Sequence, residues 1–122
     1  MEERRWLPEV IVQLMDRVEA RLDEAWTLDG MADEARFSSF HFHRMFRRAV
    51  GETPAAFLER IRLERAALLL LASEEPITDL ALDVGFRRPQ TCARRFRAHF
   101  GVSARDYRSL QLALWADIGL EA

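Results

Sequence analysis

Two short stretches of the chain concentrate arginine, the side chain best suited to bind phosphate oxygens and base edges. Residues 36–50 contain four arginines and no acidic residue, which gives this stretch a formal charge of +4. Residues 86–108 contain seven arginines against Asp106 alone, which gives a charge of +6. The guanidinium fork donates paired hydrogen bonds to phosphate or to the O6 and N7 atoms of guanine. Two such stretches in one chain predict a surface that binds nucleic acid.

The charge of the whole chain points the other way. The 122 residues carry 18 cationic side chains, all of them arginine, and 20 acidic ones, so the net charge is −2 and the pI about 5.9. Nucleic-acid-binding domains are usually basic. Outside the two arginine-rich stretches the charge is −12, so the total averages basic segments with an acidic remainder. A charge run is also typical of a plain solvated face, and the acidic remainder should limit non-specific DNA binding.

The other reactive side chains form no recognisable catalytic or metal site. His41 and His43 are two residues apart, so they point to different faces of a helix, and no second ligand pair accompanies them. Cys92 has no disulfide partner, and Arg94 and Arg95 nearby could lower the pKa of its thiol. A small helix residue is nevertheless favoured over a redox sensor at this position. We therefore expect no enzyme, no metal and no cofactor.

The length of 122 residues predicts one compact domain, or two very small subdomains that share a core. With 49% hydrophobic and 31% charged residues, the composition is that of an ordinary globular chain. The longest apolar run, residues 66–72, is far shorter than the ~20 residues that cross a bilayer. Residues 2–5 are all charged, and no apolar signal core follows them. The expected location is the cytoplasm, in association with the nucleoid and away from membranes.

The sequence repeats itself after about 50 residues. At an offset of 50 the pairs are Arg44 with Arg94, Phe46 with Phe96, Arg47 with Arg97, Gly51 with Gly101, Thr53 with Ser103 and Phe57 with Tyr107. Before these, Ala32 pairs with Ala81 and Phe37 with Phe86 at an offset of 49. Each copy consists of a short helix, a turn that ends in phenylalanine, and an arginine-rich helix that a glycine terminates.

Apolar residues recur every three or four positions and no strand alternation is present, which predicts an all-α fold. About seven helices are expected, over residues 8–25, 28–35, 38–50, 54–72, 78–84, 88–100 and 103–107, and residues 111–122 are also compatible with a helix. The expected N-caps are Ser38, Thr53, Thr78 and Ser103, and the expected helix-ending glycines are Gly51 and Gly101. Because residues 68–71 are all leucine, the second half of helix 54–72 should be covered on more than one side, as a strut shared by the repeats.

Each copy has the layout of a DNA-binding helix-turn-helix, in which the second helix enters the major groove. The first unit spans about residues 28–51, the second spans about residues 77–101, and the helix over residues 54–72 joins them. A rigid connection could place the two reading helices about one turn of DNA, ~34 Å, apart on one face of a duplex. One chain could then read an asymmetric site without dimerising.

Three parts of the chain carry a more specific pattern. They are residues 37–46 (FSSFHFHRMF), residues 60–66 (RIRLERA), and residues 77–86 (ITDLALDVGF) with 94–97 (RRFR) and 100–103 (FGVS). In that order they resemble the first recognition helix, the linker helix and the second-unit signature of the AraC/XylS family of bacterial transcription regulators. The match covers about residues 28–108. It implies an all-helical DNA-binding domain over residues 8–110, with residues 111–122 as a tail or the start of a connection to a further domain.

The resemblance assigns base contacts to residues of both units. They are Phe40, His43 and Arg44 in the first unit, and Pro89, Gln90, Thr91 and Arg94 in the second. Charge and expected exposure assign phosphate contacts to Arg47, Arg48, Arg88 and Arg97. The chain departs from the family at Pro89, where a polar base reader is common, at Cys92, where a larger apolar residue is usual, and at Ala104, where proline is usual. These departures favour the first unit for sequence readout, and the second for phosphate contact and DNA bending.

The function that the resemblance implies is sequence-specific binding of double-stranded promoter DNA by a transcription regulator, with RNA polymerase as a further candidate partner. A sensing domain, which family members usually attach, is not visible in the 122 residues. The alternative is an all-helical protein-interaction module that keeps the fold without specific DNA binding. The net charge, Pro89 and Cys92 favour that alternative.

Overall fold

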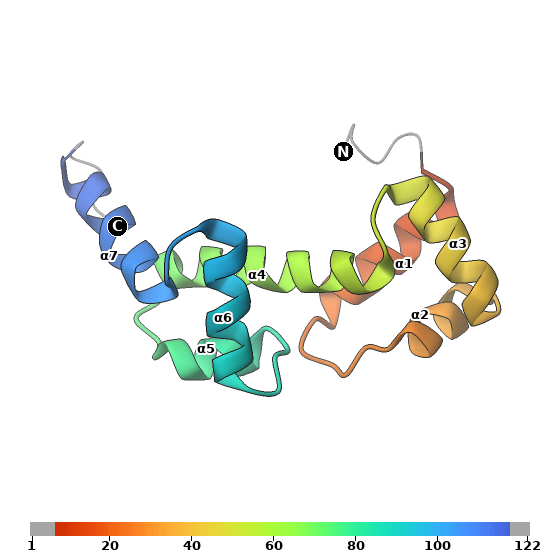
Figure 1. Ribbon diagram of the computed structural model, residues 1–122, viewed down its shortest axis with the longest axis horizontal. Helices are drawn as coiled ribbons and strands as arrows, with labels where there is room; N and C mark the ends of the chain where they lie inside the picture. The colour runs from red at the N-terminus through yellow and green to blue at the C-terminus, as the bar shows by residue number, and fades with distance from the viewer. Residues whose placement is uncertain (1–6, 118–122) are drawn as a thin grey trace. The chain divides into compact units, whose positions relative to one another are not determined.

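The computed structural model describes residues 7–117, and within this range the chain forms seven α-helices and no strand, as the sequence predicts (Figure 1). The helices are α1 (Glu9–Ala20), α2 (Leu28–Ala35), α3 (Ser39–Val50), α4 (Pro54–Ala72), α5 (Ile77–Asp83), α6 (Pro89–Phe100) and α7 (Ala104–Asp117). None of these helices combines the length and apolarity that crossing a lipid bilayer requires. The chain divides after Ile61 into two units, and each unit has its own hydrophobic core.

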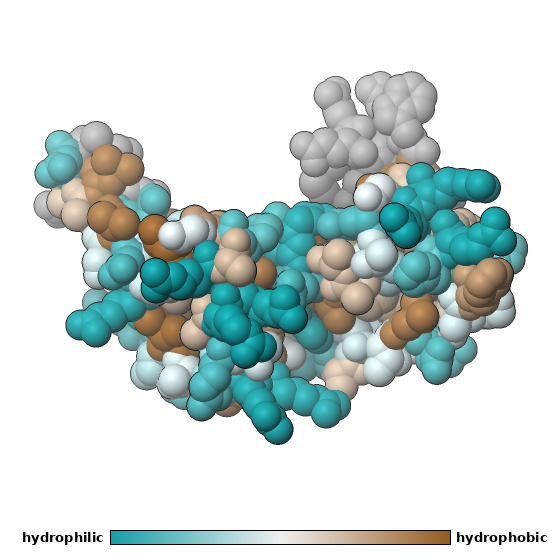
Figure 2. Space-filling view, viewed as in Figure 1, coloured by the Kyte–Doolittle hydropathy of each residue, from teal (hydrophilic) through white to brown (hydrophobic). Residues whose placement is uncertain are grey.

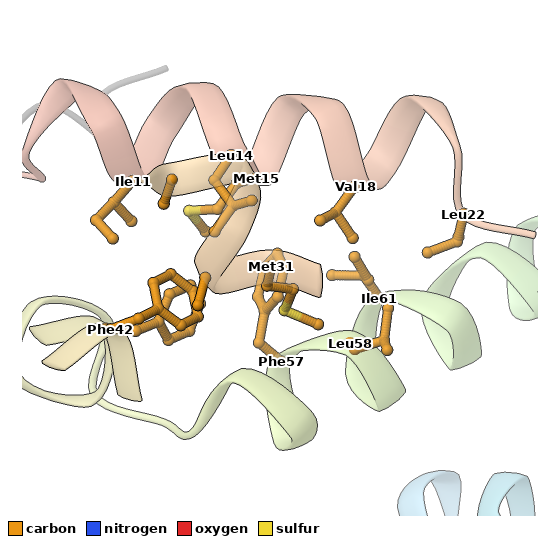
Figure 3. Close-up of a cluster of buried hydrophobic side chains, with 13 residues drawn as sticks. Ile11, Leu14, Met15, Val18, Leu22, Met31, Phe42, Phe57, Leu58 and Ile61 are labelled. Atoms are coloured by element: carbon orange, nitrogen blue, oxygen red, sulfur yellow. The ribbon is translucent and has the colours of Figure 1, made fainter. Parts of the chain in front are cut away.

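The first unit consists of α1, α2, α3 and the first half of α4. Helix α1 turns one apolar face inward, from Ile11 to Val18, and Leu22 continues this row beyond the helix end. Figure 3 shows the row opposite side chains of the other three helices. The ring of Phe46 meets the ring of Phe57 edge-on, with 5.4 Å between the ring centroids. Each of these large apolar side chains stabilises the fold by about 1.5–3 kcal/mol when it is fully buried.

The second unit repeats this arrangement with the second half of α4, α5, α6 and the start of α7. Its buried residues are Leu63, Ala66, Ala67, Leu70, Leu80, Ala81, Val84, Phe86, Cys92, Phe96 and Ala104. Phe96 meets Tyr107 edge-on with 5.5 Å between centroids, at the positions that correspond to Phe46 and Phe57 in the first unit. The offset of 50 residues is therefore a repeat of core contacts as well as of residue types.

Helix α4 contributes to both cores with different faces. Phe57 and Ile61 belong to the first core, whereas Leu63 and Leu70 belong to the second. The prediction that the leucine run would be covered on more than one side is wrong, because Leu68 is 63% exposed. Successive residues of an α-helix are about 100° apart, so the buried three- and four-residue steps share one face and Leu68 falls on another. The second half of α4 is therefore buried along one face.

Two other helix boundaries differ from the prediction. Helix α1 ends at Ala20 because Arg21 leaves the helical conformation, with φ −127° and ψ 45°. The indole Nε1 of Trp26 donates to the carbonyl oxygen of Arg21 at 2.9 Å, and the backbone N–H of Glu24 donates to the same oxygen at 3.1 Å. Helix α5 begins at Ile77 after Pro76, so the predicted N-cap at Thr78 is wrong and this residue lies inside the helix.

Helix α7 extends to Asp117, well beyond the predicted end at residue 107. Ser103 is its N-cap as predicted, since its Oγ accepts a hydrogen bond from Asp106 N at 3.1 Å. Arg108 donates to the carbonyl oxygens of Leu70 at 2.9 Å and Ser73 at 3.2 Å, and so holds α7 against the end of α4. Residues 111–117 are helical, and residues 118–122, the rest of the expected tail, lie outside the described residues.

Two arginines of the first unit hold α1 against α2. Arg21 Nη2 donates to Glu34 Oε1 at 2.8 Å, and Arg17 Nη1 lies 3.6 Å from Glu34 Oε2. The hydrogen bond from Arg21 lowers the pKa of the Glu34 carboxyl below its ordinary value. The Arg21 guanidinium also lies 5.0 Å from the centroid of the Trp26 ring. These arginines therefore stabilise the fold of the unit and are separate from the basic stretch over residues 36–50.

The turn between α2 and α3 holds a non-glycine residue in the left-handed conformation. Arg36 has φ 62° and ψ 43°, and its equivalent in the second unit, at an offset of 49, is Gly85 with φ 108°. Phe37 N donates to Ala32 O at 2.9 Å, and the equivalent hydrogen bond of the second turn is 3.1 Å long. A residue with a Cβ loses roughly 1–2 kcal/mol in this conformation. The first turn therefore carries backbone strain that glycine would relieve.

Replacing Arg36 with glycine is expected to raise the free energy of unfolding by roughly 0.5–1 kcal/mol. The relieved strain exceeds the extra backbone entropy that glycine loses on folding. Urea unfolding followed by circular dichroism measures the change. Gly85→Ala is the matched reverse substitution and should lower the stability, because its Cβ would stand at φ 108°. A lower unfolding midpoint for Arg36→Gly would contradict the assignment of strain to this turn.

Candidate nucleic-acid interface

Helix α3 is fixed at both ends and along its inner face. Ser38 is the N-cap, as predicted, and its Oγ accepts a hydrogen bond from His41 N at 3.2 Å. Gly51 ends the helix with φ 90°, also as predicted. Phe42 and Phe46 are buried on the inner face. Because the core and the caps set the position of α3, its outer face is presented in a defined orientation.

The outer face of α3 presents an aromatic ring and three guanidinium groups to solvent. Phe40 is 73% exposed, and Arg44, Arg47 and Arg48 are exposed as well. The guanidinium carbon of Arg44 lies over the Phe40 ring, 5.6 Å from its centroid. Half-buried His43 joins them around an open hollow on this face, where Figure 2 shows hydrophilic side chains gathered over α3. The structure thus brings the three predicted base readers of the first unit together.

Helix α6 has the same terminating glycine and buried inner face as α3, but its N-terminus differs. Its N-cap is Arg88, which makes no side-chain capping hydrogen bond, and Pro89 is its first residue. Gly101 ends the helix with φ 81°, as predicted, and Cys92 and Phe96 are buried on its inner face. Arginine therefore stands at the start of α6, where α3 has a capping serine.

The outer face of α6 is basic and has no exposed aromatic ring. Gln90, Arg94 and Arg97 are exposed at spacings of four and three residues, which places them on one face of the helix. Pro89 and Thr91 are half-buried, so less of their surface is available to a DNA groove. Figure 2 shows strongly hydrophilic side chains gathered over α6. The structure therefore divides the predicted base readers of the second unit into exposed and half-buried residues.

The candidate phosphate contacts are all open to solvent. The exposed residues of this set are Arg47, Arg48, Arg88 and Arg97. Sequence reasoning missed Arg87, which is exposed beside Arg88 and for which the charge run is the available signal. It also missed the contact between Phe40 and Arg44, which their spacing of four residues permits. Both features add to the surface that a DNA backbone or groove would meet.

Cys92 is a core residue of the second unit. It is 5% exposed, and burial raises the pKa of its thiol to about 11. The expectation that Arg94 and Arg95 could lower this pKa is wrong, because both side chains are exposed while the thiol lies in the core. The interpretation of Cys92 as a small packing residue is confirmed.

Two short helix pairs, each with a buried inner face and an exposed arginine-rich second helix, define a helix-turn-helix DNA-binding protein. Residues 31–109 match the family model described as "Helix-turn-helix domain". Over 100 residues the chain is 32% identical to regulatory protein SoxS of Salmonella typhimurium, and the alignment covers 82% of this chain and 94% of SoxS. The chain belongs to the AraC/XylS-type family of DNA-binding transcription regulators, and is not an enzyme.

Solved structures agree with this assignment. The DNA-binding domain of the transcriptional factor AdpA, in complex with a target DNA, matches with a TM-score of 0.82 and 28% identity over 84% of this chain and 93% of that one. A transcriptional regulator from Chromobacterium violaceum with an AraC-type DNA-binding domain matches with a TM-score of 0.77 and 25% identity, over 83% and 90% of the two chains. The predicted fold class and family are therefore both confirmed.

Proposed function

We propose that the chain binds an asymmetric site on double-stranded DNA as a single polypeptide, with α3 and α6 each entering a segment of the major groove. One observation carries this proposal. At repeat-equivalent positions, the two helices bury Phe46 and Phe96 and expose Arg44 and Arg94. In both units a buried phenylalanine thus fixes the inner face of the helix, and an arginine on the outer face is exposed to solvent, as a DNA-recognition helix requires.

The proposed roles of the individual side chains follow their exposure. Base contacts come from Phe40, His43 and Arg44 on α3, and from Pro89, Gln90, Thr91 and Arg94 on α6. Phosphate contacts come from Arg47, Arg48, Arg88 and Arg97. The half-buried state of Pro89 and Thr91 supports a division of labour, in which α3 supplies most of the base discrimination and α6 most of the backbone contact.

The domain bounds, the second partner and the location of the protein are also proposed, by analogy with the relatives. Residues 8–110 form one DNA-binding domain, with a first helix-turn-helix at about 28–51, a linker helix at 54–72 and a second helix-turn-helix at about 77–101. The site lies in a promoter, and RNA polymerase is the second partner. The protein works in the cytoplasm, at the nucleoid, and residues 111–122 are a C-terminal tail or the start of a connection to a further domain.

A salt titration tests the proposal against the alternative of a protein-interaction module. Four phosphate contacts predict that log K falls with log salt at a slope of about −3.6, which weakens DNA binding roughly 150-fold between ~50 and ~200 mM salt. Fluorescence anisotropy with a duplex selected from a random pool measures the slope. Arg47→Ala should reduce it by about one. Absence of DNA binding at the lower salt, together with salt-independent binding to a protein, would establish the interaction module instead.

A further inference from the structure

We propose that Phe40 and Arg44 act as one unit, which reads a guanine together with a neighbouring pyrimidine that carries a 5-methyl group. Thymine and 5-methylcytosine both satisfy this requirement, so binding at a CG step depends on cytosine methylation. The inference rests on the proposed entry of α3 into the major groove. It goes beyond it by assigning the aromatic ring a chemical ligand, the 5-methyl group.

The exposure of the Phe40 ring is the first observation. Every other phenylalanine of the chain is buried or half-buried, whereas Phe40 is 73% exposed. Its ring stands in the first turn of α3, at the end of a recognition helix that approaches the base edges. The methyl group of thymine is the apolar group that an unmodified base pair presents in the major groove. An apolar surface placed here therefore has one kind of partner among the base edges.

The position of the Arg44 guanidinium is the second observation. Its carbon lies over the Phe40 ring, 5.6 Å from the centroid, and the two residues stand one helical turn apart. A guanidinium held over a ring keeps its N–H donors available at its edge. Those donors match the O6 and N7 acceptors of guanine. Because successive base pairs are about 3.4 Å apart, the ring and the fork are close enough to meet adjacent base pairs at the same time.

The second unit offers an internal comparison. The repeat equivalents of Phe40 and Arg44 are Gln90 and Arg94, both exposed on α6. Gln90 has an amide where Phe40 has a ring, so α6 presents an arginine without an apolar neighbour at that position. The methyl requirement therefore belongs to α3 alone, and the guanine that Arg94 meets should be indifferent to a methyl group beside it.

Removal or addition of a single methyl group in the DNA tests the inference. The reference duplex is the sequence recovered from a random pool, and the altered base is the pyrimidine on the 5′ side of the guanine whose preference Arg44→Ala abolishes. Thymine is replaced by uracil, and in a second duplex cytosine is replaced by 5-methylcytosine, so each pair differs by one methyl group. Anisotropy should show about fourfold weaker binding without the methyl in both pairs, which is the effect of burying one such group.

The variants separate the ring from the rest of the helix. Phe40→Ala should bind both members of each pair equally, and Phe40→Tyr, which keeps the ring, should retain the preference. Leu68→Ala truncates another exposed apolar side chain, on α4, and should change nothing. Equal binding of the thymine and uracil duplexes by the unaltered protein, or a preference that survives in Phe40→Ala, overturns the inference alone. If the unaltered protein binds all duplexes equally, both the inference and the proposed function are overturned.

Discussion

Replacing Arg44 with alanine is expected to weaken binding to the preferred duplex by about 1–3 kcal/mol, or about fivefold to somewhat more than a hundredfold. The exposed guanidinium is the proposed bidentate partner of a guanine, and alanine leaves those two acceptors without donors. The base preference at that position should relax at the same time. Because Arg44 is exposed, the substitution leaves the core of the first unit intact. Anisotropy on the preferred duplex and on its single-base variants measures both effects.

Arg47→Ala on the same helix is the matched control for this experiment. Arg47 is equally exposed and is proposed to contact phosphate, so its loss should weaken all duplexes alike and reduce the salt slope by about one. A base preference in Arg44→Ala that equals that of the unaltered protein would refute the readout role of Arg44. A change of preference in Arg47→Ala would move the readout role to that residue.

Replacing Phe46 with alanine is expected to destabilise the first unit by about 3–5 kcal/mol. Phe46 is fully buried, and its ring lies 5.6 Å from Phe42 and 5.4 Å from Phe57 between centroids. A loss of this size is a large part of the total stability of a small domain. Because the second core contains none of these residues, α5 and α6 should keep their protection from amide hydrogen exchange while α1, α2 and α3 lose theirs.

Phe96→Ala is the reciprocal substitution. It removes the equivalent ring from the second unit, where Phe96 packs against Phe100 and Tyr107. Protection should now be lost in α5 and α6 and retained in α1 and α3. If either substitution removed protection from both units to the same extent, the two cores would unfold as one cooperative body, and their separation in the fold would have no thermodynamic counterpart.

The elements that the sequence predicts well are those that local interactions determine. Ser38 begins α3 through a side-chain acceptor, and Gly51 and Gly101 end α3 and α6 through a left-handed backbone. Neighbouring residues alone specify these helix boundaries. At the end of α1 the indole of Trp26 donates to the carbonyl oxygen of Arg21, and the length of α7 accompanies the contact of Arg108 with α4. These contacts join residues that periodicity does not relate, so the predicted ends of both helices were wrong.

The roles of the individual arginines at the site could likewise be predicted only in part from the sequence. A charge count gives equal weight to Arg44 and Arg108, since both lie in basic stretches. The structure separates them, because Arg108 donates to carbonyl oxygens of α4 while Arg44 lies over an exposed ring. The outward positions of Arg47 and Arg48 follow from helical periodicity, and were predictable. The pKa of Cys92 was not, since burial decides its direction and the neighbouring charges do not.

The two recognition helices are built on one plan but present different surfaces. Phe40 and His43 of α3 correspond to Gln90 and Ala93 of α6. A protein of two identical halves reads a palindrome, and its complex looks the same from either end of the DNA. In the proposed binding mode, a single chain with two unlike helices gives its binding site a polarity, so inverting the site turns the bound protein around. The orientation of the site relative to the gene would then affect regulation, in addition to the distance of the site from the start of transcription.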